Sequence, residues 1–254
     1  MTSPIGAILD ARLAADAASP LITYYDDETG ERTELSATTL ANWAVKSANL
    51  LQDGLDVEAG QEVAVLLDPH WQSAAILLAT WAVGAIVTET TPADVVVTSE
   101  ARFVEFQEAD AGVREIVALS LHPMGRPLAT KRSGVTDYAD VLLYGDHFAP
   151  YTPVEPDAIA LRAGRLELTG RSVANAAAEL AGRLGLAIGD RLLVDVEAVR
   201  GGGPLPWLLA PLAAGASIVL CRRAEPGKLA HRAETERVTV TMGVHVEGIR
   251  AAGS

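Results

Sequence analysis

The hydrophobic and polar residues of the chain alternate in blocks that predict successive helices and strands. Apolar residues at helical spacing predict amphipathic helices, and short continuous apolar runs predict strands buried on both faces of a parallel sheet. Two helices and two strands are expected between Glu167 and Leu220. Further helices are expected at Ile5–Ala17, Ala37–Gln52 and Trp71–Val83, and further strands at Leu21–Tyr25, Arg32–Leu35, Glu62–Leu67, Ala85–Glu89, Asp94–Thr98, Glu115–Leu119, Asp140–Tyr144, Ala158–Arg162, Arg165–Leu168 and Glu236–Gly243. This order of elements predicts an α/β fold with mainly parallel sheets flanked by helices.

The run from Glu167 to Leu220 repeats the plan of an earlier run, from Glu34 to Val87. Each run reads helix, turn, strand, helix, strand. The matched positions include turn glycines, which composition does not dictate: Gly60 with Gly189, and Gly84 with Gly215. Chance similarity between helices rich in Ala and Leu is the alternative. The repeat predicts two similar lobes, residues 1–150 and 151–254, packed as one compact unit and joined by the proline-rich segment His147–Pro156.

Composition limits the partners that such a protein can have. The formal net charge is −13, and aromatic residues make up only 5% of the chain. Polyanions are repelled by an acidic surface, so nucleic acids and anionic membrane surfaces are not expected partners. With so few aromatic residues, aliphatic side chains must build the core, which suits helices packed on a parallel sheet.

Cysteine usage and the apolar runs indicate the compartment. The single cysteine, Cys221, cannot form an internal disulfide, so a reducing, cytoplasmic setting is expected. A buried structural thiol is favoured over a nucleophile, because no base is recognisable near it. The apolar runs Ser73–Val87 and Leu205–Leu220 are shorter than the roughly 20 residues that a bilayer requires. No secretory signal is recognisable at the N-terminus, so a soluble protein is expected.

Gly201-Gly202-Gly203 is the strongest candidate site that the residues alone suggest. It lies between a predicted strand and a predicted helix, where backbone N–H groups could hold a phosphate. The triplet does not match GxGxxG or GxxxxGK[ST], so a tight turn is the competing interpretation. Glu197 could act as an acid, a base or a metal ligand, although a solvated carboxylate at a strand end is simpler. The five histidines share no metal-ligand spacing and GxSxG is absent, so no catalytic or metal-binding residue is predicted.

Several short motifs follow one another in an order that resembles the N-terminal region of adenylate-forming enzymes. These are the acyl-CoA synthetases, luciferases and peptide-synthetase adenylation domains. Segments similar to their LTHRxxxAN, LxxGDRxL and LxPLxxGAxxV motifs are Leu168–Asn175, Leu186–Arg191 and Leu209–Ala216. Weaker similarities occur at Thr33–Leu40, Gly60–Leu67, Gly84-Ala85 and Val238–Val244. The resemblance covers nearly the whole chain and implies two similar α/β lobes. A short actinobacterial family is what the chain most resembles.

The chain departs from this resemblance at the positions that the chemistry requires. The resemblance places a phosphate-binding loop rich in Ser, Thr and Gly between Ile159 and Leu168, and that loop is missing here. ATP phosphates need such amides and hydroxyls. Arg200 stands where a His of the acyl pocket is implied, and Gly170 stands where Thr169 should be followed by a His. The chain also ends before the implied adenine-binding segments and the domain with the catalytic Lys. A shortened relative without adenylation activity is expected.

Three functions follow as alternatives. The first is a non-catalytic binding or scaffolding module whose ATP phosphate loop has been deleted. The second is an acyl-adenylating enzyme of the acid–thiol ligase type, or half of one, completed by a partner. The third is a protein that binds a phosphorylated ligand through arginines expected near the strand ends. Those arginines are Arg162, Arg165, Arg171 and Arg200.

The candidate ligand site gathers the glycines and polar residues that follow the predicted strands of the second half. They are Gly164, Arg165, Thr169, Arg171, Glu197, Arg200, Gly201, Gly202 and Gly203. No cofactor is expected, and ATP and AMP are disfavoured, whereas a small acyl or phosphorylated ligand suits these residue types. The shortened chain should leave apolar surface uncovered, which predicts a homodimer or a partner protein.

Overall fold

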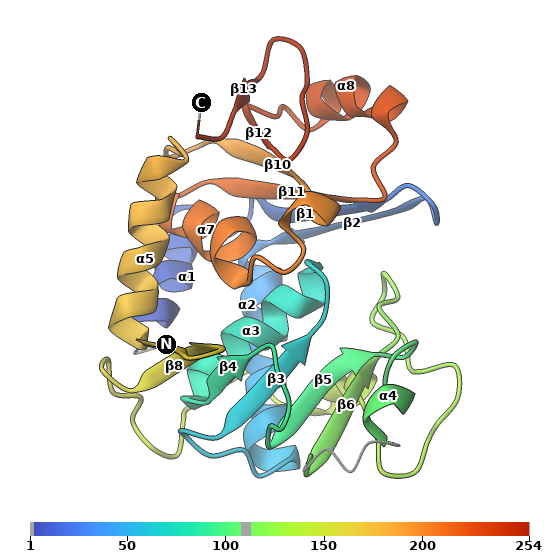
Figure 1. The fold of residues 1–254 in the computed structure, drawn as a ribbon, viewed down its shortest axis with the longest axis vertical. Coiled ribbons are helices and arrows are strands. Elements are labelled where there is room, and N and C mark those ends of the chain that lie inside the picture. The colour runs from blue at the N-terminus through green and yellow to red at the C-terminus, as the bar shows by residue number, and fades with distance from the viewer. Residues whose placement is uncertain (1–2, 108–112, 254) are drawn as a thin grey trace. The chain divides into compact units, whose positions relative to one another are not determined.

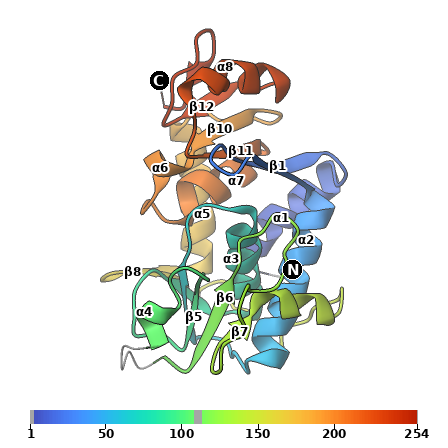
Figure 2. The ribbon, with the colours of Figure 1, turned by 90° about the vertical axis from the view of Figure 1, so that its right-hand side faces the viewer.

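The chain forms two compact units, each built on one mainly parallel β-sheet (Figures 1 and 2). The computed structural model describes residues 3–107 and 113–253. Unit 1 consists of Met1–Ala7, Ala41–Leu67 and Gln72–Val173, and unit 2 consists of Ile8–Leu40, Asp68–Trp71 and Ala174–Ser254. The predicted fold class, α/β with mainly parallel sheets flanked by helices, is confirmed.

The sheet of unit 2 has six strands in the order β13-β12-β10-β11-β1-β2. All neighbouring strands are parallel except the β1–β2 hairpin. The apolar residues of β10 and β11 are buried on both faces of the sheet, as their continuous runs predict. The bounds are β1 Pro20–Asp26, β2 Glu31–Ser36, β10 Arg191–Asp195, β11 Ser217–Arg222, β12 Val240–Met242 and β13 Arg250–Ala251.

Helices α7 (Ala210–Ala214) and α8 (Pro226–Thr235) lie on opposite faces of this sheet, as Figure 1 shows. Leu229 of α8 packs in one buried cluster with Leu193 of β10 and Val219 of β11. Successive side chains of a strand point to opposite faces, so the residues next to Leu193 and Val219 point to the opposite face of the sheet. The long apolar run that follows the glycine triplet forms helix α7 and strand β11, both inside unit 2.

A π-helical turn, η3 (Leu205–Leu209), precedes α7. Its first carbonyl, that of Leu205, accepts the backbone N–H of Ala210 five residues later. Pro211 has no N–H to donate into the next turn, which accounts for the irregular hydrogen bonding at this point.

The sheet of unit 1 has seven strands in the order β7-β6-β5-β3-β4-β8-β9, and only the β8–β9 hairpin is antiparallel. The short helix α4 (Val104–Gln107) lies beside β5 and β6 in Figure 2. The preceding residue, Phe103, is buried with Ile116 of β6 and with Leu128. The bounds are β3 Glu62–Leu66, β4 Ile86–Thr88, β5 Val95–Ser99, β6 Glu115–Leu119, β7 Thr136–Asp137, β8 Ile159–Ala163 and β9 Leu166–Thr169.

The two hairpins explain why both units are discontinuous in sequence. β1–β2 comes first in the chain, yet β1 pairs with β11 in the register Ile22↔Ile218. β8–β9 comes after residue 150, yet β8 pairs with β4 in the register Val87↔Leu161. The predicted lobes 1–150 and 151–254 therefore differ from the units of the structure, because each hairpin joins the sheet of the other repeat.

The proline-rich segment expected to be a linker lies within unit 1 and is hydrogen-bonded to the end of helix α2 (Ala37–Asn49). Asn49 Nδ2 donates to the carbonyl of His147 at 2.9 Å. Gln52 Nε2 donates to the carbonyl of Ala149 at 3.3 Å, and Gln52 Oε1 accepts the N–H of Tyr151 at 3.0 Å. These amide side chains make the hydrogen bonds to the loop backbone that water would make if the loop were exposed.

Most predicted elements are present, and the exceptions have local causes. The remaining helices are α1 Pro4–Ala15, α3 Trp71–Val83, α5 Gly170–Arg183 and α6 Val196–Val199, together with the π-helical turn η1 Leu50–Gly54. The strand expected at Asp140–Tyr144 is wrong: a 3₁₀ helix, η2 Tyr138–Leu143, begins there because the Asp137 side chain accepts the N–H of Ala139. Helix α8 was not expected, and the turn that follows it at Glu236 and Arg237 shortens the predicted strand Glu236–Gly243 to β12.

No helix in the described part of the chain combines the length and the apolar character needed to cross a bilayer.

Candidate functional site

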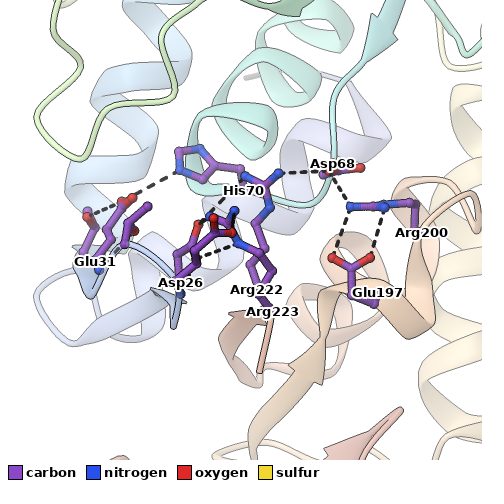
Figure 3. Close-up of polar contacts among 11 residues, drawn as sticks. Asp26, Glu31, Asp68, His70, Glu197, Arg200, Arg222 and Arg223 are labelled. Atoms are coloured by element: carbon purple, nitrogen blue, oxygen red, sulfur yellow. Dashed lines mark hydrogen bonds and ion pairs between the residues drawn. The ribbon is translucent and has the colours of Figure 1, made fainter. Parts of the chain in front are cut away.

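Charged side chains gather where the parallel strands of unit 2 end. β1 ends at Asp26, β11 ends at Arg222 and is followed by Arg223, and β10 ends at Asp195 before α6. The carboxyl ends of parallel strands share one edge of a sheet, and open α/β sheets bind ligands at that edge. Figure 3 shows the network of polar contacts formed there.

Asp26 and Arg223 form the innermost pair of this network. Arg223 Nε donates to Asp26 Oδ1 at 2.9 Å, Nη2 bonds Oδ2, and Nη1 bonds Glu28. The Asp26 side chain is only 4% exposed. Burial opposes ionisation of this carboxyl, but the hydrogen bonds from Arg223 and from the backbone hold the pKa of Asp26 below its usual range. The pair is therefore ionised at neutral pH.

Asp68 connects the ends of β10 and β11 by binding two arginines. Its Oδ2 lies 2.9 Å from Arg200 Nη2 and 3.7 Å from Arg222 Nη2. Arg200 also reaches Glu197, three residues before it, at 3.0 Å. Figure 3 shows Arg200 lying between the two carboxylates. The guanidinium of Arg200 is therefore already engaged by acidic side chains.

His70 is the buried aromatic member of the network. Its ring meets the ring of Tyr24 edge-on, with the centroids 4.3 Å apart, and its Nε2 lies 3.9 Å from Glu31 Oε1. Burial, with a smaller contribution from Arg222, lowers the pKa of His70 to about 3. Burial also raises the pKa of the Glu31 carboxyl. The imidazole is neutral at physiological pH, where it fills space between aromatic and charged neighbours.

A second ionic cluster in unit 2 is buried around Glu236, the residue that follows α8. Glu236 Oε1 accepts from the Tyr25 hydroxyl at 2.6 Å and from Arg32 Nη2 at 2.9 Å, and Oε2 bonds Arg191. Burial would raise the pKa of this carboxyl, but the hydrogen bonds from these three side chains hold the pKa of Glu236 below its usual range. The cluster ties the end of α8 to three strands of the sheet.

The charged side chains at this sheet edge neutralise one another. The arginines at the strand ends bind carboxylates of the same unit, so the edge is not an open cradle for an anion. Among residues 3–107 and 113–253, no group of three or more His, Cys, Asp or Glu side chains is placed to hold a metal ion. Asp26 and Asp27 lie where the β1–β2 hairpin turns, a position at which carboxylates are often solvated, yet the side chain of each is buried against an arginine.

The predicted glycine triplet forms a turn beside a groove. The side chain of Asp195 caps α6 by accepting the N–H of Glu197 at 3.2 Å. Gly202 N–H then bonds the carbonyl of Val199 at 3.0 Å, and Gly201 and Gly203 adopt φ of 78° and 67°, which favour glycine. A groove of about 450 Å³ in unit 2 is lined by Ala176, Glu179, Leu180, Arg183, Gly202, Leu205 and Pro206.

The other predicted site residues lie in unit 1 and have local partners. Gly164 and Arg165 form the two-residue turn of the β8–β9 hairpin, with Gly164 at φ 59°. Thr169 Oγ1 accepts the N–H of Ser172 at 3.1 Å at the start of α5. Arg171 binds Asp157 through both oxygens, at 2.9 and 3.2 Å. These contacts are structural, and the site assignments themselves stay predictions.

The predicted set of four arginines divides between the units. Arg162, which binds Glu62 and Glu167, lies in unit 1 with Arg165 and Arg171, whereas Arg200 lies in unit 2. The residues that sequence reasoning missed are Asp68, His70, Arg222 and Arg223. Their signal is position, because Asp68, Arg222 and Arg223 end or follow an apolar strand run and His70 lies two residues after Asp68. Such positions meet at one sheet edge.

Comparison with known proteins identifies first a fold and then a family. No family model matches the chain. The Brucella canis acyl-CoA synthetase structure matches 94% of this chain and 47% of its own, with a TM-score of 0.74 and 17% identity. The N-terminal domain of FACL13 from Mycobacterium tuberculosis matches 94% and 62%, with a TM-score of 0.73 and 15% identity. A long-chain-fatty-acid-CoA ligase from Archaeoglobus fulgidus matches 94% and 51%, with a TM-score of 0.75 and 15% identity.

The fold is therefore that of the N-terminal region of acyl-CoA synthetases, as the motif order predicts, and the chain spans about half the length of most of these structures. A TIGR03089 family protein of Mycobacterium tuberculosis is 44% identical, over 94% of this chain and 99% of the relative. The chain belongs to the TIGR03089 family. The expected resemblance to a short actinobacterial family is confirmed.

Proposed function

We propose that this protein is a non-catalytic binding or scaffolding module built on the adenylate-forming fold. The observation that carries the proposal is the β8–β9 hairpin. Ala163 pairs directly with Leu166, so only Gly164 and Arg165 connect the strands. The resemblance places the phosphate loop in this interval, and a two-residue turn offers neither the hydroxyls nor the row of amides that ATP phosphates require.

The position of Arg200 supports the same proposal. The resemblance implies a His of the acyl pocket at this position, whereas Arg200 is held between Asp68 and Glu197. Moving Arg200 to admit a substrate would leave Glu197 without its cation and Asp68 with only the more distant Arg222. The local electrostatics favour a fixed ionic surface over a pocket for an acyl group.

Acyl-dependent exchange of pyrophosphate into ATP tests the proposal directly. We expect the purified protein to give no exchange above a protein-free blank across short-chain, long-chain and aromatic acids. A full-length acyl-CoA synthetase measured in parallel shows that the assay works. Exchange above the blank with any of these acids would overturn the proposal.

The principal alternative is half of an acyl-adenylating enzyme, completed by a partner chain or a second copy. The shared fold with acyl-CoA synthetases favours it, and the anthranilate CoA ligase with the same fold was solved with anthranoyl-AMP. Ligand binding separates the alternatives, because a ligand at 100 times its Kd stabilises the native state by about 2.7 kcal/mol. A rise in melting temperature with ATP or AMP, without exchange, would favour the half-enzyme. An unchanged melting temperature favours the non-catalytic module.

The proposed setting is the cytoplasm. Cys221 is buried, and burial raises the pKa of its thiol to about 11, so it is protected from oxidation as well as from disulfide exchange. A protein with one shielded thiol has no need of an oxidising compartment.

A further inference from the structure

Exposed apolar side chains gather in one segment of unit 1. Seven large apolar side chains are exposed in the described part of the chain, and three of them lie within residues 142–151. They are Leu142, Leu143 and Tyr151, which are 55%, 83% and 79% exposed. Single exposed apolar side chains are normal on a soluble protein, whereas a group of them marks a contact surface, and tyrosine is enriched in such surfaces.

The tyrosines of this segment lie against the end of the π-helical turn η1. The Tyr151 hydroxyl donates to Asp53 Oδ1 at 2.8 Å. The Tyr144 hydroxyl fills the space that a side chain at Gly54 would take. Because Asp53 and Gly54 are adjacent, the two tyrosines belong to one surface, and Leu143 extends that surface at the residue before Tyr144.

Carboxylates border this surface. Burial, and then the charges of Asp140 and Asp53, raise the pKa of the Tyr144 hydroxyl. The hydrogen bond and charge of Asp53, with smaller contributions from burial and from Asp56, raise the pKa of the Tyr151 hydroxyl. A negative charge opposes ionisation of a phenol when it lies close, so these carboxylates are near both rings. The Leu142–Tyr151 surface is defined by Leu142, Leu143, Tyr144 and Tyr151, with Asp53, Asp56 and Asp140.

Lys46 and Arg114 reach this surface without neutralising it. Lys46 Nζ donates to the carbonyl of Tyr144 at 2.6 Å and lies 2.6 Å from Asp146, and the lysine side chain is only 17% exposed. Arg114 Nη2 donates to the backbone carbonyl of Asp56 at 3.5 Å. The charge of Lys46 is balanced by Asp146, and Arg114 offsets one of the bordering carboxylates. The surface therefore keeps a negative charge.

We propose that the Leu142–Tyr151 surface binds a basic amphipathic segment of a partner protein. An apolar group with an acidic border is complementary to an apolar stripe flanked by lysines or arginines. A second copy of this chain fits less well, because a two-fold contact through the surface sets the carboxylates of one copy against those of the other. Nucleic acids and anionic lipid surfaces are repelled by the same carboxylates.

The Leu142–Tyr151 surface gives the proposed binding or scaffolding function a class of partner, and it rests on that function. The two fail separately, because exchange of pyrophosphate into ATP tests catalysis, whereas peptide binding tests this surface. A few exposed side chains bury little area, so the contact is weak and reversible.

Fluorescence anisotropy with a defined peptide tests the surface. The probe is a labelled helical peptide with leucines along one stripe and lysines beside it, and the matched peptide has glutamates in place of the lysines. We expect the protein to bind the lysine peptide saturably, more weakly as salt rises, and the glutamate peptide at least tenfold more weakly. No saturable binding of the lysine peptide, or equal binding of the two peptides, would overturn the proposal.

Removal of one apolar side chain locates the binding. Leu143→Ser should weaken binding of the lysine peptide about tenfold or more, because that is the contribution of burying a leucine side chain. Ile188→Ser removes an apolar side chain that is 89% exposed in unit 2 and should leave the binding unchanged. Melting temperatures confirm that both variants are folded. Equal weakening by the two variants would place the peptide elsewhere and refute the surface.

Charge reversal tests the acidic border independently. The double variant Asp56→Lys, Asp140→Lys should weaken binding of the lysine peptide and strengthen binding of the glutamate peptide, because the border changes sign. The control Glu234→Lys, Glu247→Lys changes the net charge equally at exposed positions of unit 2 and should change both affinities far less. Equal changes in the two double variants would show that net charge alone governs binding and would overturn the proposal.

Discussion

Ionisation of single residues in unit 2 depends on which partner each buried group can reach. Asp26 and His70 are both buried, yet Asp26 is ionised because Arg223 binds both of its oxygens, whereas His70 stays neutral. Burial disfavours the charged form of either group, and only a close opposite charge reverses that preference. His70 has Arg222 nearby, which opposes a second positive charge.

Replacing His70 should change how stability depends on pH. The folded-state pKa of about 3 lies below the ordinary 6.5, so between these values the unfolded chain takes up a proton that the folded chain does not. The contribution of His70 to the free energy of unfolding is therefore complete above pH 6.5 and is lost as the pH falls below that value. Between pH 6.5 and 5 the wild type should lose roughly 2 kcal/mol through this residue. His70→Gln should lack that loss in urea unfolding at the two pH values.

Other acids that titrate in this range affect both proteins, so the difference between them isolates His70. Glu31→Gln serves as a second control, because Glu31 lies 3.9 Å from the imidazole. Equal loss of stability in the wild type and in His70→Gln would contradict the neutral buried imidazole.

Glu236 should be the most costly carboxylate to remove. Its side chain is 4% exposed and accepts from Tyr25, Arg32 and Arg191. Glu236→Ala leaves the largely buried Arg191 without its carboxylate, and breaking such a pair costs about 3–5 kcal/mol. Glu179→Ala removes an exposed ion pair with Arg183 at 3.6 Å and should cost less than about 1 kcal/mol. Urea unfolding measures both, and similar costs would refute the burial argument.

At the scale of elements, the sequence predicts which segments form strands. It does not predict short elements that depend on one capping side chain. The apolar runs of β3, β5, β10 and β11 predict strands at the observed places, and Gly60, Gly189 and Gly215 predict the turns before β3, β10 and β11. The 3₁₀ helix η2 depends on Asp137 capping the N–H of Ala139, which periodicity does not show. Helix α8 has few apolar residues, and tertiary packing of Leu229 and Ala233 on the sheet stabilises it.

Helix α6, which follows β10, and the loop after β12 lie so close that a single added methyl group should affect stability. A Cβ at Gly243, which has φ 82°, would lie 2.3 Å from Ala198 Cβ. Gly243→Ala should therefore destabilise the protein by more than the roughly 1 kcal/mol cost of a left-handed residue. Gly248→Ala has nearly the same φ, 79°, with no atom within 4 Å, so it measures that backbone cost alone.

Chemical denaturation of the two alanine variants tests this difference. Ala198→Gly should recover stability in Gly243→Ala by opening the required space. Equal stability of the two single variants would show that helix α6 and the loop after β12 can separate without cost.

At the scale of the whole molecule, the sequence repeat predicts two sheets but not their strand membership. The matched glycines Gly84 and Gly215 mark equivalent turns, and both copies have the predicted helix and strand order. Nothing in the pattern of β1 indicates that it pairs with β11, because pairing partners are chosen by long-range contacts. The same limit applies to the site: Glu197 and Arg200 are near in sequence and pair, whereas Asp68 reaches Arg200 from a distant segment.

Cutting the chain at residue 150 should yield two fragments that do not fold alone. Fragment 1–150 lacks β8–β9, which leaves β4 without one neighbour, and fragment 151–254 lacks β1–β2, which leaves β11 without one. Neither fragment should show cooperative urea unfolding, whereas the intact chain should. A cooperative transition in either fragment alone would show that a continuous lobe is an independent domain.

Because each hairpin joins the sheet of the other repeat, the first hairpin is synthesised long before its partner strand. Ile22 of β1 pairs with Ile218 of β11, so about 200 residues must be translated before the first hairpin meets its parallel neighbour. At a translation rate of about 5–20 residues per second, the apolar face of β1 remains without its parallel neighbour for roughly 10–40 s. During that interval the nascent strand, with Leu21 and Ile22 uncovered, is a natural client for chaperones that hold extended apolar segments.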